Sequence, residues 1–185
     1  MFIQTESTPN PNAVKFIPGV EISPNGPIHF ANKNDAENTS LGRRLFSIDG
    51  IESVFFGRDF ITITKNDDSL WDKIKVEVIV AIMDHVEANI PIFDHKIADQ
   101  NLYIDLSEIE KQIVEIIETR VRPSVAMDGG DIIFKSFENG IVTLVLKGAC
   151  SGCPSSTITL KQGIESMLKY YVPEVISVEA CAEEN

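Results

Sequence analysis

The sequence predicts an α+β fold, built as two small domains joined by a linker. Each half of the chain contains short strand-like segments joined by turns, and each contains a helix with an apolar stripe. A stretch without either pattern separates the two halves. The chain has 185 residues, which is enough for two small domains. We expect residues 1–88 to form the first domain, 89–103 the linker and 104–185 the second domain.

The first domain is predicted from alternating apolar segments and one long helical stripe. Ser69 is a candidate N-cap for a helix that runs to Ala88, in which apolar residues recur every four positions. Gly57-Arg58-Asp59 favours a hairpin. Prolines and glycines make 18–27 a loop. We expect strands at 2–7, 13–17, 51–56 and 60–64, and a short helix at 40–48.

The second domain follows the order α-β-β-α-β. Ser107 and Glu110 match a capping box, and an apolar helical stripe follows as far as Val121. Asn139-Gly140 is a strong hairpin signal between strands at 132–137 and 141–147. Pro154 suits the first turn of a second helix, which Pro173 ends before a strand at 175–180. Pro123 and Gly129-Gly130 are expected to mark the exit from the first helix.

The composition limits the possible partners. The net charge is −12, and both halves of the chain carry more acidic than basic residues. Neither nucleic acid nor an anionic membrane surface is an expected partner, because both need clustered positive charge. No apolar run reaches the length of about 20 residues that crosses a membrane. The first residues resemble neither a secretory signal nor a transit peptide, so we expect a cytoplasmic protein of bacterial type or a processed mitochondrial matrix protein.

Three cysteines occur in the chain, and two of them form a C-x-x-C pair at Cys150 and Cys153. Thiolate is the metal-binding form of cysteine. The helix that begins at Pro154 has free backbone N–H groups at its N-terminus, which favour negative charge. Gly148 and Gly152 leave room for a bulky anion. These features predict a metal or cluster site on this pair.

The number of ligands points to a symmetric dimer. Zinc sites and cubane iron–sulfur sites typically use four protein ligands, whereas this loop provides two. The three histidines, His29, His85 and His95, all lie at or before the linker and lack zinc-finger spacing. Two copies of the chain donating two cysteines each would complete the set. Such a site would be labile, which suits a cluster donor better than an electron carrier.

The residues alone leave several readings open. Tetrahedral four-sulfur geometry serves zinc and iron–sulfur clusters equally well. A zinc-binding interaction module is therefore one alternative, and a thiol-disulfide oxidoreductase is another. We disfavour the oxidoreductase because the motif follows a hairpin, with no evident βαβ unit ahead of it. Structural cysteines are a further possibility, disfavoured by the paired spacing and the flanking glycines. Cys181 has no motif role and is expected to be a free thiol.

The sequence around the cysteine pair resembles the NifU-like domain of Nfu-type iron–sulfur scaffold proteins. The resemblance continues through 159–165 and, upstream, through 122–125 and Asp128-Gly129-Gly130-Asp131. The first domain resembles the Nfu N-terminal domain at 8–12 and at Lys15-Phe16. The resemblance thus covers nearly the whole chain.

The resemblance implies a cluster carrier and not an enzyme. It implies that Cys150 and Cys153 bind one [4Fe–4S] cluster shared across a homodimer. Apo iron–sulfur proteins would receive the cluster, and upstream assembly machinery would supply it. The first domain contains no cysteine and no catalytic constellation, so we expect it to recognise targets or to regulate transfer.

Overall fold

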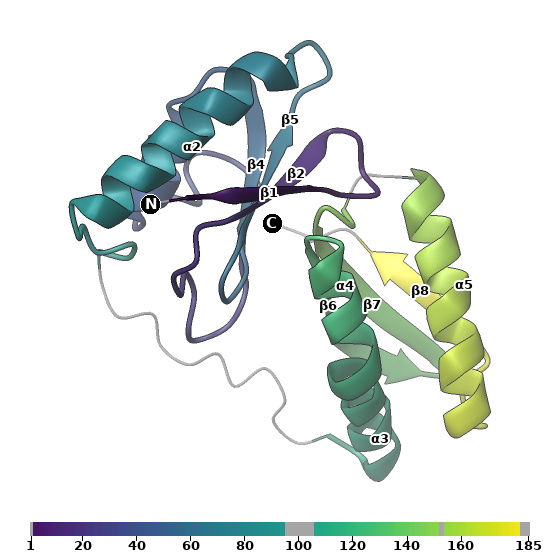
Figure 1. The fold of residues 1–185 in the computed structure, drawn as a ribbon. Coiled ribbons are helices and arrows are strands. Elements are labelled where there is room, and N and C mark those ends of the chain that lie inside the picture. The colour runs from purple at the N-terminus through teal and green to yellow at the C-terminus, as the bar shows by residue number, and fades with distance from the viewer. Residues whose placement is uncertain (1, 95–105, 152–153, 182–185) are drawn as a thin grey trace. The chain divides into compact units, whose positions relative to one another are not determined.

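The chain folds into two compact units, residues 1–100 and 101–185 (Figure 1). The computed structural model describes residues 2–94, 106–151 and 154–181, and for 154–157 it describes the backbone alone. Each unit combines helices with a sheet, which confirms the predicted α+β class. Within the described residues, no helix is both long enough and apolar enough to cross a membrane.

The first unit is a five-stranded antiparallel sheet. Its strands are β1 (Gln4–Ser7), β2 (Ala13–Ile17), β3 (Ile28–Phe30), β4 (Ile51–Phe56) and β5 (Ile61–Lys65), in the order β1-β2-β5-β4-β3. The helices are α1 (Ser40–Phe46) and α2 (Trp71–Glu87), and α2 lies along one face of the sheet (Figure 1). Side chains alternate between the two faces, so one face gathers the apolar residues. Its buried members include Val14, Phe16, Val54, Phe56, Ile61 and Ile63.

Two local features of the first unit differ from the prediction. Strand β3 was not predicted, because three residues after a proline-rich loop carry too little pattern; it forms by pairing with β4. The N-cap of α2 is Leu70 and not Ser69, and it makes no side-chain capping hydrogen bond. The hydroxyl of Ser69 lies instead against Gly50, which leaves no room there for a side chain.

The segment after α2 remains attached to the first unit. The backbone N–H of Ser40 donates to the carbonyl of Ile92 at 3.0 Å, and Arg43 pairs with Asp94 at 2.5 Å. His85, near the end of α2, is 2% exposed and lies 3.4 Å from the hydroxyl of Ser40. Burial lowers the pKa of His85 below its ordinary value. His85 therefore acts as a packing residue at the point where the chain leaves α2.

The lowered pKa of His85 makes the stability of the first unit depend on pH. The unfolded chain takes up a proton near pH 6.5, whereas the folded state holds His85 neutral to lower pH. Stability should therefore fall as pH drops below the unfolded pKa. Between about pH 7.5 and about pH 5.5, where carboxylates stay ionised, we expect the thermal midpoint of wild type to fall more than that of His85→Gln. An equal fall in both proteins would contradict this assignment.

The second unit places helices on one face of a three-stranded sheet. It begins with α3 (Glu108–Ile116), a π-helical turn η1 (Ile117–Val121) and α4 (Arg122–Met127). Strands β6 (Gly130–Glu138) and β7 (Ile141–Gly148) follow, then α5 (Pro154–Tyr171) and β8 (Ser177–Cys181). Both helical segments pack on the sheet (Figure 1). The shared core includes Ile113, Ile117, Val121, Ile132, Leu144, Ile164 and Leu168.

Local signals in the second unit are largely confirmed. The Ser107–Glu110 capping box is present in full. Asn139 and Gly140 both have positive φ, as the tight turn between β6 and β7 requires. The predicted α-β-β-α-β order is confirmed, with α5 beginning at Pro154.

The exit from the first helix differs from the prediction at Pro123 and agrees with it at Gly129-Gly130, which follows the end of the helical path. Pro123 does not end the helix but lies in the first turn of α4, where its missing N–H is tolerated. The π-helical turn just before it resets the hydrogen-bond pattern, so the helical path continues to Met127.

Candidate functional site

Cys150 lies in a tight turn between β7 and α5. Gly148 ends β7 with a positive φ of 65°, and the chain reverses there. The amide and the hydroxyl of Ser151 both donate to the carbonyl of Gly148, at 3.1 and 2.8 Å. Cys150 is 7% exposed and is not part of a disulfide. The turn therefore fixes the backbone of Cys150 and holds its thiol at the edge of the core.

Strand β6 passes directly beneath the Cys150 side chain. A Cβ atom placed on Gly130 would lie 2.6 Å from the Cys150 sulfur and 2.8 Å from the carbonyl oxygen of Lys147. Real Cβ atoms essentially never come that close to another heavy atom. The amide of Ala149 also donates to the carbonyl of Gly129 at 3.2 Å. Gly129 and Gly130 therefore form a backbone surface on which the cysteine loop rests.

Only part of the predicted ligand pair lies in the described residues. Cys153 and the neighbouring Gly152 are outside them, so the position of the second thiol stays a prediction. Helix α5 begins at Pro154, immediately after the loop, as the anion-binding argument requires. The part of the chain that the structure describes contains no group of three or more His, Cys, Asp or Glu side chains able to hold a metal.

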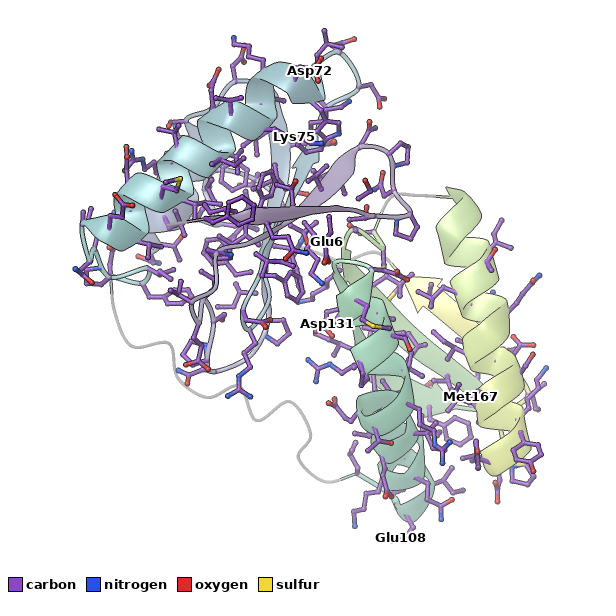
Figure 2. All side chains as sticks on the ribbon, viewed as in Figure 1. Glu6, Asp72, Lys75, Glu108, Asp131 and Met167 are labelled. Carbon is purple, nitrogen blue, oxygen red and sulfur yellow. The ribbon has the colours of Figure 1, made fainter. Side chains whose placement is uncertain are left out.

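An ion-pair network supports the start of β6. The guanidinium of Arg122 donates from Nε to Oδ1 of Asp131 at 2.8 Å and from Nη2 to Oδ2 at 3.0 Å. Its Nη1 also donates to both carboxylate oxygens of Glu118, at 2.8 and 2.6 Å. Asp131 is 4% exposed and lies beside α4 (Figure 2). Burial lowers the pKa of Arg122, but the two carboxylates outweigh that effect and raise it above its ordinary value.

The sequence alone did not identify this network. Glu118 and Arg122 are four residues apart on a helix, so their pairing could have been predicted from spacing. The contact with Asp131 could not, because it depends on how α4 packs against β6. The segment from Asp128 to Asp131 is a turn that leads into a strand, with Gly129 at positive φ and β6 beginning at Gly130.

Cys181 makes contacts on the sheet. It is opposite Val145 in the β7–β8 register. Its sulfur lies 3.5 Å from the carbonyl oxygen of Leu144 and 4.0 Å from Nζ of Lys135. It is a free thiol, as expected.

The comparisons with known proteins match both units. Residues 3–89 match the family model "Scaffold protein Nfu/NifU N terminal", and residues 113–179 match "NifU-like domain". Relatives named "NFU1 iron-sulfur cluster scaffold homolog, mitochondrial" include those of Drosophila ananassae, 47% identical over 182 residues, and Drosophila willistoni, 46% identical over 187. These alignments cover 97% and 100% of this chain, but only 64% and 65% of the relatives' lengths. A solution NMR structure of a NifU-like protein from Saccharomyces cerevisiae aligns with 52% of this chain and 87% of its own, at 27% identity and a TM-score of 0.47.

The two units and the cysteine loop define a two-domain protein of the NifU-like class. Together the two family matches span most of the chain, in the order expected from the sequence. The chain belongs to the Nfu family, with an Nfu N-terminal domain followed by a NifU-like domain.

The sequence argument against a dithiol oxidoreductase holds only in part, because the motif does follow the β6–β7 hairpin but is not outside every βαβ unit. Strand β8 pairs in parallel with β7, and α5 connects them, so the cysteine loop does lie within a βαβ unit. A short last strand gave no indication of its direction. The motif's setting therefore no longer disfavours thiol redox chemistry, and family membership is what favours a scaffold.

The contact between Gly130 and Cys150 can be tested with an alanine. Gly130→Ala would push a methyl group into the sulfur and into a backbone carbonyl, so we expect a loss of about 1–3 kcal/mol of unfolding free energy in the metal-free chain. Chemical denaturation measures this loss, and the altered sulfur position should also impair metal binding.

Gly163→Ala is a matched control in the same unit. Gly163 is exposed on α5, and a methyl group added to it would meet nothing within 4 Å beyond its own stretch of helix. The alanine should therefore stabilise the chain by about 1 kcal/mol through helix propensity. Two variants that change stability in the same direction would contradict the assigned role of Gly130.

Proposed function

We propose that the chain is an iron–sulfur cluster scaffold and carrier, in which Cys150 and Cys153 of two copies hold one [4Fe–4S] cluster. The observation that carries this proposal is the position of Cys150. Its thiol rests on Gly130, the first residue of β6, near the start of α5, in a chain of the Nfu family. The names of the relatives support the same function.

Ligand number supports the shared cluster. The pair provides two thiolates, and a cubane cluster typically needs four protein ligands. A two-fold axis through the cluster would bring the second pair from an identical loop. Large apolar side chains are also exposed on α5, which follows the loop, and at the end of α4, which leads into the glycines beneath it: Ile158 is 58% exposed and Met127 is 70% exposed. Contact between two copies at the loop would bury them.

Transfer to an apo-protein proceeds by ligand exchange. Each recipient thiol gives up a proton as it binds iron, and each departing thiolate of the scaffold takes one up. The cluster keeps its electrons, so neither protein is oxidised or reduced. Other proteins supply and receive the cluster, and the chain itself catalyses no reaction. The first unit contains no cysteine, which leaves it free to recognise recipients or regulate transfer.

The names of the relatives bear on the location of the protein. Those named above are described as mitochondrial, which favours the mitochondrial matrix over the cytoplasm for this chain.

Anaerobic reconstitution with iron and sulfide tests the function. Wild type should become brown and contain iron and sulfide in equal amounts, because the cubane has one sulfide for each iron. Cys150→Ser and Cys153→Ser should each lose the cluster, whereas the control Cys181→Ser should retain it. A colourless wild type that contains zinc alone would support the interaction module. Metal-free turnover of a disulfide substrate would support the oxidoreductase.

The surface beside the loop tests the dimer. Ile158→Gln changes both copies, so it should weaken association of the cluster-loaded chain about a hundredfold, since burying each such side chain contributes about 1.5 kcal/mol or more. Tyr170→Gln is the matched control, because Tyr170 is 80% exposed on the same helix about 18 Å further along. Sedimentation of both loaded variants measures association. Equal weakening, or none in either, would argue against a contact beside the loop.

A further inference from the structure

The first residues of β6 connect the ion-pair network to the cysteine loop. Gly129 accepts a hydrogen bond from the amide of Ala149, and Gly130 lies under the Cys150 sulfur. The next residue, Asp131, is held from the other side by two hydrogen bonds from Arg122. Three consecutive residues thus contact the loop on one side and α4 on the other. A shift of α4 or of Asp131 would be transmitted directly to the backbone beneath the thiol.

We propose that Arg122, through its bidentate ion pair with Asp131, is a positioning residue that sets the location of Gly130 beneath the Cys150 sulfur and thereby determines how long the half-site retains its cluster. The part of this inference that concerns cluster retention rests on the proposed function. The placement of the thiol can be tested without metal.

The geometry requires an arginine. Its planar fork presents Nε and Nη2 to Asp131 while Nη1 reaches Glu118. A lysine has one compact ammonium group and cannot make the bidentate contact. The two ion pairs of Arg122 differ in the segment that they join to α4. Asp131 belongs to β6, whereas Glu118 lies in η1, one turn before Arg122 on the same helical path. Of the two ion pairs, only the one with Asp131 reaches the strand on which Cys150 rests.

This difference supplies matched variants. Asp131→Asn removes the negative charge and one acceptor oxygen from the ion pair that supports Gly130. Glu118→Gln makes the same chemical change in the other ion pair of the same guanidinium. Since residues that orient metal ligands typically change metal affinity by about 10–100-fold, we expect Asp131→Asn to shorten the cluster's lifetime about tenfold. Loss of visible absorption in the presence of an iron chelator measures the lifetime, at a temperature where each metal-free chain stays folded. The cluster's lifetime in Glu118→Gln should remain within about twofold of that in wild type, since the ion pair with Glu118 does not reach the loop.

Alkylation of Cys150 gives a second reading that does not depend on a cluster. In the metal-free chain we expect iodoacetamide to modify Cys150 faster in Asp131→Asn than in wild type or in Glu118→Gln. Both cysteines lie between Lys147 and Lys161 and share one tryptic peptide, so fragmentation of that peptide by tandem mass spectrometry is used to separate Cys150 from Cys153. Arg122→Lys should behave like Asp131→Asn in both measurements, because it keeps the charge but loses the fork.

The outcomes separate the inference from the proposed function. If Asp131→Asn and Glu118→Gln change both readings equally, or if neither changes them, the positioning role is overturned. If wild type binds no iron and sulfide, the proposed function fails, and the alkylation contrast alone then decides the positioning role. If Cys150→Ser loses the cluster while Asp131→Asn retains it for as long as wild type, the function stands and the inference is wrong.

Discussion

The close approach of β6 to the Cys150 sulfur is the contact on which the site depends. It requires a residue without a side chain at Gly130, and it requires that β6 be held at a fixed depth. The buried carboxylate of Asp131 and the guanidinium of Arg122 hold the strand from the side of α4. The cysteine loop closes over the strand from the other side through the Ala149 hydrogen bond. Core packing and charge pairing therefore act on the same three consecutive residues, Gly129, Gly130 and Asp131.

A buried ion pair is an unusual way to support a strand. Replacing such a pair by well-packed apolar residues is often neutral or even stabilising, whereas removing one partner costs about 3–5 kcal/mol. The net stability that Arg122 and Asp131 contribute is therefore modest, but their geometry is strict. A directional contact fixes one position of β6, which an apolar contact would not. That property suits a strand that positions a metal ligand better than one that only fills a core.

Features with local causes were predictable from the sequence. The capping box at Ser107, the Asn139-Gly140 turn and the helix start at Pro154 each depend on neighbouring residues, and each is present. Features with tertiary causes were not. The parallel pairing of β8 and the Arg122–Asp131 contact depend on segments that meet only in the fold. For the site, the sequence predicted the cysteine pair as the ligands, which stays a prediction, and it could not show that Gly130 lies beneath Cys150.

In the proposed function, each chain carries half of a cluster site. Native mass spectrometry of the reconstituted wild-type protein tests it most directly, because the 20.5 kDa chain and its dimer are easily resolved. If two chains share the cluster, its mass should appear only on the dimer, as one [4Fe–4S] for two chains. A single chain that carries a complete cluster would contradict it.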